Sequence, residues 1–504
     1  MSDDTTLFGQ SYYLRFDPKL WQAMMPYPPL GSLLAAAYVR QMGYPVALFD
    51  AMLAESEAEW VRALEQNRPR FAVLYEDSFN YLSKMCLLRM REAAFTMAQA
   101  AKERGCIVIV SGSDATDHAA DYFQHGVDYI LLGEGEVTLG ELLDTLSGRQ
   151  ARDLSSIVGL AWLEEGQVKR TARRPFVKDL DEFPFPAWDL VDIPRYQRIW
   201  HERHGYYSMN MVTTRGCPYR CNWCAKPIYG RRYNTRSPEN VAAELKWLKE
   251  TYHPDHIWFA DDILGLKPGW IERFSQLASA QDAVVPFKCL QRVDLINEPI
   301  AQALRRAGCR TVWVGAESGS QKILDAMDKD TRVEDIYTAV RLLHEVGIEV
   351  GFFLQFGYLG ETWEDIQLTL KMVRECRPDD IGISVSYPLP GTPFYERVKE
   401  QLGPKTNWQD SDDLAMLYNG PYSPDFYRVL HHRVHHEYRA RKAWHQLRKD
   451  LRRPLALRPR HLRLALSIPL NLARLVRSST KLRQLARLRH DDPIPLQLSR
   501  GLGD

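Results

Sequence analysis

The sequence predicts an α/β protein with a doubly wound, Rossmann-like N-terminal domain, a partial TIM-type barrel of six β/α units, and a basic helical C-terminal region. Three observations predict this order. Short apolar runs alternate with helical patterns over the first 150 residues, the alternation resumes for six further units, and arginine-rich amphipathic segments follow. With 504 residues, the chain is long enough for about three domains. We expect them at residues 1–150, 206–396 and 397–504, with a connector over residues 151–205.

The N-terminal region contains four short runs rich in Val, Ile and Leu, as buried parallel strands are. They cover residues 45–51, 70–76, 106–112 and 127–133. A helical pattern over residues 30–44 precedes the first run, and Gly43 marks its end. Ligands of doubly wound sheets bind beyond the carboxyl ends of the strands. The candidate ligand-binding residues at these ends are Ser111, Gly112, Gly133 and Glu134.

The connector carries a predicted hairpin, LAWLEEGQVKRT, and a proline-containing segment. Six strand-like runs then follow, at residues 209–215, 256–262, 286–292, 311–317, 349–357 and 381–389. A helix with a recognisable start follows each run; Ser237 with Pro238, for example, forms an N-cap and first-turn proline pair. Six successive β/α units predict an open barrel whose chemistry lies at the carboxyl ends of its strands.

The C-terminal region is basic and helical in pattern. Between Arg428 and His490 there are 18 Lys or Arg residues and 2 acidic residues, although the net charge of the whole chain is +1. We expect Pro454, Pro459 and Pro469 to divide the region into short helices. A basic amphipathic surface predicts peripheral contact with an anionic membrane, or docking on the acidic remainder of the same chain; we expect no nucleic acid partner.

Several protein classes are excluded by composition. No stretch of 18 apolar residues lacks a charge, so we expect no membrane span. The first residues, MSDDTTLFGQ, are acidic where a secretory signal would be basic and apolar, so we expect a cytoplasmic protein. Eight cysteines in 504 residues are too few and too unevenly placed for a disulfide scaffold.

Three of the cysteines lie together in the segment TTRGCPYRCNWCAKP, as Cys217, Cys221 and Cys224. Three thiolates on one loop can hold three corners of an iron-sulfur cubane and leave the fourth iron without a protein ligand. A structural zinc site would need a fourth ligand, but the next cysteine is Cys289 and no histidine follows nearby. The spacing therefore favours a 4Fe-4S cluster over zinc.

This CxxxCxxC segment resembles the signature of the radical S-adenosylmethionine (SAM) superfamily, and the resemblance continues through residues 209–396. The resemblance implies that SAM binds the open iron and is cleaved reductively to a 5′-deoxyadenosyl radical. It therefore implies a low-potential electron donor such as a flavodoxin or ferredoxin.

The resemblance also implies cofactor contacts at four barrel strand ends. Asp261 and Asp262 in FADD would receive the methionine ammonium, and Arg292 would pair with its carboxylate. Glu317, followed by Ser318 in GAESGSQ, would accept the ribose hydroxyls, while Gly357 lets the backbone approach adenine. For any single residue, a capped helix or solvated charge is an equally good explanation. The sequence does not identify a catalytic residue.

The N-terminal region together with the barrel resembles the cobalamin-binding subgroup, which includes anaerobic magnesium-protoporphyrin monomethyl ester cyclases and cobalamin-dependent C-methylases. Segments such as SGSDATDH and VDYILLGEGEVTLGELL carry this resemblance. The lower axial histidine motif is absent, because Asp50, Ala51 and Met52 stand in its place. The alternative is a Rossmann-like domain without a cofactor.

The resemblance implies cobalamin-dependent C-methylation of a small molecule of lipid, isoprenoid or tetrapyrrole type. An oxidative cyclase is the first alternative. A transfer-RNA-modifying enzyme and a non-enzymatic metal-binding scaffold or sensor are the others.

Overall fold

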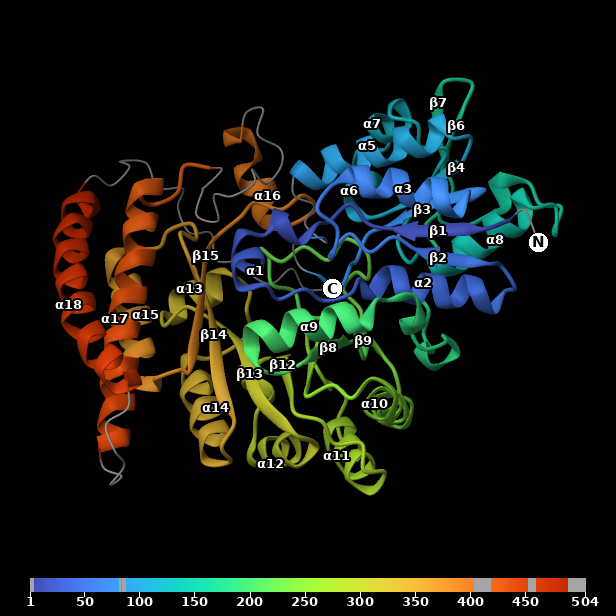
Figure 1. Ribbon diagram of the computed structural model, residues 1–504. Coiled ribbons are helices and arrows are strands. Elements are labelled where there is room, and N and C mark those ends of the chain that lie inside the picture. Colours follow the sequence, from blue (N-terminus) through green and yellow to red (C-terminus); the bar gives the residue numbers. More distant parts are fainter. Residues whose placement is uncertain (1–3, 81–82, 84–87, 403–417, 452–458, 488–504) are drawn as a thin grey trace.

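The computed structural model describes residues 4–80, 83, 88–402, 418–451 and 459–487 (Figure 1). The blue N-terminal domain lies above the carboxyl ends of the barrel strands, which are drawn green to orange, and two long red helices lie at the side of the barrel. This arrangement confirms the predicted fold class of a doubly wound domain, a partial barrel and a helical C-terminal region.

The N-terminal sheet has the strand order β2-β1-β3-β4-β5-β6-β7. Its first five strands are parallel, and β6 and β7 extend it as an antiparallel hairpin. The strands are β1 (Thr6–Gly9), β2 (Val46–Leu48), β3 (Phe71–Tyr75), β4 (Ile107–Ser111), β5 (Tyr129–Leu131), β6 (Leu160–Glu164) and β7 (Gln167–Arg170). The four predicted runs are all strands, and β1 is an additional strand that the sequence patterns did not reveal. Because the order reverses beside β1, a crevice is expected between the ends of β1 and β3.

Helices cover both faces of this sheet (Figure 1). One core packs α2 (Leu30–Gln41) and α8 (Glu136–Leu146) on one face, and a second packs α3 (Glu57–Asn67) and α5 (Leu88–Glu103) on the other. The smaller helices of the domain are α1 (Pro18–Ala23), α6 (Ser113–Asp117) and α7 (Ala119–Gln124). Helix α9 (Ile193–His204) then leads into the barrel.

The barrel sheet is parallel throughout and has the order β15-β14-β13-β12-β11-β8. Its strands are β8 (Ser208–Met211), β11 (His256–Phe259), β12 (Phe287–Gln291), β13 (Cys309–Glu317), β14 (Glu349–Phe356) and β15 (Asp380–Val385). Its helices are α10 (Pro238–Tyr252), α11 (Trp270–Ala280), α12 (Glu298–Ala307), α13 (Gln321–Ala326), α14 (Val333–Glu345), α15 (Trp363–Cys376) and α16 (Pro393–Val398). All six predicted strands are present. In the described residues β8 and β15 do not pair, so the barrel is open.

The C-terminal region forms two antiparallel helices, α17 (Pro424–Leu451) and α18 (Pro459–Ala486), of 28 residues each. The expectation that Pro469 ends a helix is wrong, because Pro469 lies inside α18. The helix tolerates this proline because both Pro469 and Ala465 are exposed. The carbonyl of Ala465, which lacks the usual N–H donor from residue 469, can therefore bind water. Pro454 lies outside the described residues.

Helix α17 docks on its own barrel. Phe426, Leu430 and Val434 are at most 2% exposed, and Glu437 accepts from Arg374 of α15 at 2.5 Å. For this helix, therefore, the basic region docks on the remainder of the same chain, which was the alternative to membrane contact. Among the described helices, none combines the length and apolar character that crossing a membrane requires.

Candidate active site

The cysteine segment is a closed loop at the carboxyl end of β8. Its two ends pair as β9 (Thr214–Arg215) and β10 (Asn234–Thr235), which fixes the base of the loop. Gly216 begins the loop with a φ of 81°, and a Cβ there would lie 2.3 Å from the carbonyl oxygen of Arg232. Only glycine fits this closure.

The loop gathers Cys217, Cys221 and Cys224 at one end of the barrel. Cys221 is 7% exposed, and Cys217 and Cys224 are partly exposed. Burial raises the pKa of the Cys224 thiol to about 11, Lys226 opposes this, and the other two cysteines add to it. The thiols therefore influence one another electrostatically, and a bound metal would be needed to hold Cys224 as a thiolate at neutral pH.

The donor set fits a 4Fe-4S cluster better than a single ion. In the part of the chain that the structure describes, no three His, Cys, Asp or Glu side chains are close enough together to hold one metal ion. Thiolates that bind a cubane stand at separate corners and need not meet at one point. Three cysteines on one loop supply three corners, and the fourth iron would remain open.

Asp261 follows β11 and is 1% exposed, but its carboxylate is already saturated. The backbone N–H groups of Thr213 and Thr214 donate to it at 2.7 and 2.8 Å, and both hydroxyls donate at 2.9 and 3.0 Å. Asp261 therefore holds the strand that leads into the cysteine loop. Asp262 is exposed and influences the pKa values of Cys217 and Cys224, so it faces the loop. Of the two acids, Asp262 is the better candidate for the SAM ammonium.

This difference predicts opposite effects for two matched substitutions. Asp261→Asn should lower the unfolding free energy by about 2–4 kcal/mol, because an amide cannot accept all four hydrogen bonds. Asp262→Asn should change stability by less than about 0.5 kcal/mol while weakening SAM binding. Chemical denaturation and equilibrium SAM binding separate the two effects. Equal stability losses would contradict the assignment.

Arg292, at the end of β12, lies under the cysteine loop. Its guanidinium is 3.5 Å from the ring centroid of Tyr219 and donates to both carboxylate oxygens of Asp294, at 2.9 and 3.1 Å. It also donates to the carbonyls of Lys329 and Asp330. The predicted pairing with the methionine carboxylate would have to share these partners, and it remains a prediction.

Glu317 ends β13 at a register shift, with a φ of 54°. A bulge re-aims a side chain at the cost of a strained backbone. The strain here turns Glu317 toward Lys329, whose ammonium donates to it at 3.0 Å. Cys221 also interacts electrostatically with Lys329, which places Lys329 beside the cluster loop. No sequence pattern pointed to Lys329, because it lies between two acids in the short segment DKDTR.

The other two predicted SAM contacts lie at neighbouring strand ends. Ser318 is fully buried, and its hydroxyl bonds that of Thr369 at 3.1 Å, which makes its contact here internal. Gly357 has a φ of 81°, and its N–H donates to Glu361 at 2.7 Å. Burial raises the pKa of Glu361 to about 8. The structure thus brings the predicted barrel residues to one end of the sheet, and their contacts with SAM remain predictions.

The predicted residues of the N-terminal domain also lie at strand ends. Ser111 is 4% exposed, and its hydroxyl lies 2.9 Å from where a Cβ of Gly135 would be. Gly133 has a φ of 84° and no atom within 4 Å of where a Cβ would lie, whereas a Cβ at Gly112 would lie 3.1 Å from Glu76. Their role in binding a ligand remains a prediction.

Glu76 is a residue that the sequence did not single out. It follows β3 at the point where the strand order reverses, and it accepts from the Ser11 N–H at 2.9 Å. Its second oxygen, Oε2, is buried without a hydrogen-bond partner, and burial raises its pKa to about 7. An orphaned acceptor at this crevice is where a ligand with N–H groups would bind.

Arg215 joins the cysteine loop to the N-terminal domain. It donates to both carboxylate oxygens of Glu136, at 2.7 and 3.3 Å, and Glu134 lies 3.8 Å away. The N–H of Val177, in the connector, donates to the other oxygen of Glu134 at 2.8 Å. Sequence patterns gave no signal for this contact, because 79 residues separate Arg215 from Glu136.

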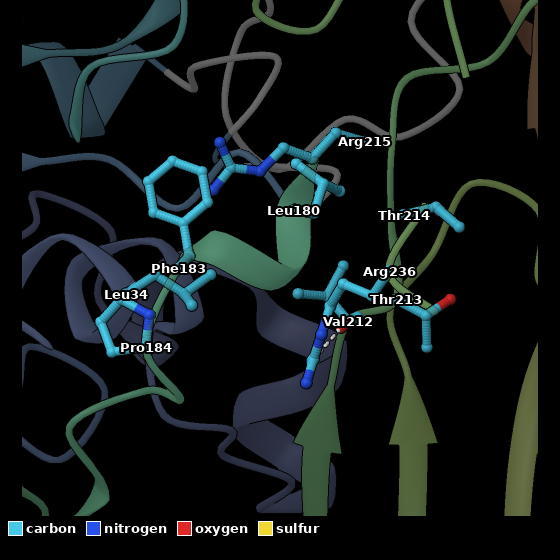
Figure 2. Close-up of a pocket in the computed structure, with 9 residues that line it drawn as sticks. All are labelled: Leu34, Leu180, Phe183, Pro184, Val212, Thr213, Thr214, Arg215 and Arg236. Carbon is cyan, nitrogen blue, oxygen red and sulfur yellow. Dashed lines mark hydrogen bonds between the residues drawn. The ribbon is translucent and has the colours of Figure 1, made fainter. Parts of the chain in front are cut away.

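Figure 2 shows the small pocket behind this contact, where the guanidinium of Arg215 lies by the ring of Phe183, 4.8 Å from its centroid. Arg236 donates there to the carbonyl of Val212 at 3.0 Å. A second contact joins the domains, since Phe79, after β3, stacks on Tyr229 of the cysteine loop at 5.4 Å. The carboxyl ends of both sheets therefore meet at the cysteine loop.

Comparison with curated proteins finds relatives that are named as a methyltransferase, a cyclase and a methylase. The chain is 30% identical to an uncharacterized methyltransferase of Pyrococcus horikoshii, over 53% of this chain and 58% of the relative. It is 27% identical to the anaerobic magnesium-protoporphyrin IX monomethyl ester cyclase of Rubrivivax gelatinosus, over 51% and 46%. It is 26% identical to the hopanoid C-3 methylase of Methylococcus capsulatus, over 84% and 79%. The chain thus spans about half the length of the first two relatives.

A solved structure shares the fold. The radical SAM methyltransferase TsrM of Kitasatospora setae, solved with cobalamin and a 4Fe-4S cluster, superposes with a TM-score of 0.65 over 81% of this chain and 79% of that one, at 20% identity. At the level of sequence families, residues 211–373 match the radical SAM superfamily. This segment starts at the last residue of β8 and contains the cysteine loop and the strands β11 to β14. The chain therefore carries a radical SAM domain and is similar to proteins named as a methyltransferase, a cyclase and a methylase.

Proposed function

We propose that this protein is a cobalamin-dependent radical SAM enzyme that methylates an unactivated carbon of a small molecule. One observation carries the proposal: the cysteine loop contacts the strand ends of the N-terminal domain through Arg215 and Tyr229. A cofactor bound at those strand ends would therefore lie next to SAM. Such proximity is what transfer of a methyl group to a substrate carbon needs.

In the barrel, Cys217, Cys221 and Cys224 would hold the 4Fe-4S cluster. The cluster, when bound, supplies the electron that cleaves SAM, so a low-potential donor such as a flavodoxin or ferredoxin is part of the proposal. Asp262 would orient the SAM ammonium, and Glu317, held by Lys329, would accept the ribose hydroxyls. Asp261 would keep the loop in place through Thr213 and Thr214.

The N-terminal domain fits cobalamin bound without a histidine ligand from the protein. Ala51 and Met52 are at most 4% exposed and pack in the core, while Asp50 accepts from Tyr196 at 2.9 Å. Cobalamin has amide groups around its ring, and the orphaned oxygen of Glu76 would accept a hydrogen bond from one of them. Gly133 leaves its strand end open for close approach.

The relatives support methylation and suggest the substrate class. One is named as a methyltransferase and one as a hopanoid methylase, which fits a lipid, isoprenoid or tetrapyrrole-like substrate. The cyclase relative leaves anaerobic oxidative cyclisation as the second candidate, because the same loop and domain contact would serve it. The reaction product distinguishes the two.

The deciding experiment is anaerobic reconstitution of the full chain with iron, sulfide and hydroxocobalamin. We expect about four irons and one cobalt per chain. Glu76→Gln should retain the irons and lower the affinity for cobalamin, because the oxygen that remains is held by the Ser11 N–H and an amide nitrogen replaces the orphaned acceptor Oε2. Four irons without cobalt would overturn the cobalamin assignment and leave the radical SAM chemistry in place.

We also propose that this protein is cytoplasmic and makes peripheral contact with membranes through α18. The outward-facing Leu466, Leu470 and Val476 are 51–67% exposed, and basic residues such as Arg474 and Arg477 flank them. Exposed apolar side chains beside arginines suit an anionic lipid surface.

The full chain should therefore sediment with phosphatidylglycerol vesicles and much less with phosphatidylcholine vesicles. Leu470→Gln combined with Val476→Gln should lower the bound fraction several-fold. Equal sedimentation with both kinds of vesicle, or no effect of the double substitution, would contradict membrane contact through α18.

A further inference from the structure

The inner face of the barrel sheet carries apolar side chains that are not covered. Along β14, Phe352 and Leu354 point to the helices and are at most 1% exposed, whereas Phe353 between them is 40% exposed. Trp258 of β11 and Trp313 of β13 show the same alternation and are partly exposed. An open row of aromatic side chains inside a barrel marks a ligand-binding surface more often than a core.

Two of these rings form a platform that the glycines of neighbouring strands make possible. Trp313 pairs in register with Gly351, and a Cβ at Gly351 would lie 2.4 Å from its ring. A Cβ at Gly382 would lie 3.4 Å from Phe353 and 3.5 Å from Trp313. The rings of Trp313 and Phe353 are 4.8 Å apart at 31°. Both rings therefore lie low across the sheet, and Phe353 remains 40% exposed.

A cation stands at the amino end of this platform. Lys288 of β12 pairs in register with Trp258 and with Thr311. Its ammonium lies 4.7 Å from the ring centroid of Trp258 and 5.5 Å from that of Tyr27. Among the described residues no carboxylate forms a salt bridge with it, and burial alone lowers its pKa to about 8.

The neighbours of Lys288 do not supply the missing negative charge. His256 lies near Trp258 on β11, and its Nδ1 forms a hydrogen bond with the Ser208 hydroxyl at 2.8 Å. Burial lowers the pKa of His256 to about 3, so its ring is neutral. Tyr27 bonds the same hydroxyl at 3.0 Å. The aromatic rings stabilise the ammonium by about 0.5–2 kcal/mol, less than a paired anion would. A ligand anion would complete the site.

Trp313 of the aromatic platform lies on the same strand as residues beside the cysteine loop. On β13, Trp313, Gly315 and Glu317 alternate along the same inner face, and Gly315 lies against the ion pair of Glu317 and Lys329. Lys329 interacts with Cys221. From the level of Lys288 to that of Glu317 is six residues, roughly 15–20 Å along the strand.

We propose that this inner face binds the substrate of the radical reaction as an elongated, apolar, ring-containing anion, with its acidic group at Lys288 and its rings on Trp313 and Phe353. This rests on the proposed function for the chemistry at the far end. A body of about 15–20 Å places the reacting carbon at the cysteine loop. Shorter or uncharged molecules lose one of the two contacts.

The test measures binding to the full reconstituted chain with 8-anilinonaphthalene-1-sulfonate, a fluorescent ring-containing anion. Its displacement is followed with cholate, a polycyclic carboxylate, and with geranylgeranyl monophosphate, an isoprenoid anion. The uncharged methyl ester of cholate is the third competitor. Cholate, which contains rings, should displace the probe more strongly than the acyclic isoprenoid anion.

Lys288→Gln should weaken both anionic competitors about tenfold and leave the methyl ester unchanged. Phe353→Ala should weaken all three competitors and leave the fold intact, because Phe353 is 40% exposed. Lys246→Gln, on the outside of α10, is the matched control and should change nothing. Melting curves of each variant establish that the fold is retained.

Three outcomes overturn the inference: no displacement by either anion, equal behaviour of Lys288→Gln and Lys246→Gln, or stronger displacement by the acyclic anion than by cholate. The second outcome would place the fluorescent probe elsewhere, such as on the exposed face of α18. SAM cleavage by the wild-type chain is measured in the same preparation. Lys288-dependent binding without SAM cleavage would refute the proposed function alone, and SAM cleavage without Lys288-dependent binding would refute this inference alone.

Discussion

Replacing Cys221 with alanine should abolish reductive cleavage of SAM while leaving the fold intact. Cys221 is the middle ligand of the loop and lies near Lys329, so its loss removes one of three thiolates from a cluster that has no spare protein ligand. Two cysteines do not retain a cubane with an open iron. We expect the iron content to fall and 5′-deoxyadenosine formation to drop to the level of the iron-free chain.

A buried cysteine outside the loop provides the control. Cys376, at the end of α15, is 8% exposed and about as buried as Cys221. Cys376→Ala should retain about four irons and wild-type SAM cleavage, at a stability cost of about 1 kcal/mol. Iron analysis measures the cluster content, chromatography of 5′-deoxyadenosine measures SAM cleavage, and thermal melting measures stability. Four irons and full cleavage in Cys221→Ala would show that the cluster assignment is wrong.

The barrel could be predicted from sequence because each of its strands is a short apolar run between helix signals. Residues 349–357, for example, are apolar enough to mark β14 without knowing its partners. Strand β1 escaped because it is only four residues long and begins with threonine. What makes it a strand is its position between β2 and β3, where both edges are paired. That information is tertiary and does not lie in the local pattern.

The candidate site divides in the same way. The cysteine spacing identified the cluster loop, because all three ligands are local in sequence. Residue type alone could not separate Asp261 from its neighbour Asp262, since what separates them is which one the Thr213 and Thr214 donors reach. Arg215 and Glu76 were missed for the same reason: each acquires its meaning from a partner at least 65 residues away.

Arg215→Met should lower the unfolding free energy by about 3–5 kcal/mol, because it leaves two buried carboxylates without a counter-charge. The side chains of Arg215 and Glu136 are 5% and 2% exposed, and Glu134 is 3% exposed. Methionine matches the length of the arginine stem but donates no hydrogen bond. Chemical denaturation of the full chain measures the loss.

An exposed ion pair in which an arginine also donates to both oxygens of one carboxylate provides the control. Arg40 donates to both oxygens of Asp189 at 2.6 and 2.8 Å, but these side chains are 42% and 59% exposed. Arg40→Met should cost no more than about 1 kcal/mol, because water replaces the lost partner. If both substitutions cost the same, burial is not what makes the Arg215 contact important.

The pH dependence separates loss of a counter-charge from loss of packing. Burial already raises the pKa of Glu134, and Arg215 opposes that shift, so removing the arginine should raise it further. A carboxyl whose folded pKa exceeds its unfolded value destabilises the fold as pH rises through that range, since the folded state binds more protons. The deficit of Arg215→Met should therefore be smaller at pH 5 than at pH 8. Adding Glu134→Gln and Glu136→Gln to Arg215→Met should recover most of the lost stability at pH 8. If the loss instead depends neither on pH nor on these two acids, Arg215 stabilises the domain contact through its packing on Phe183 and Tyr229.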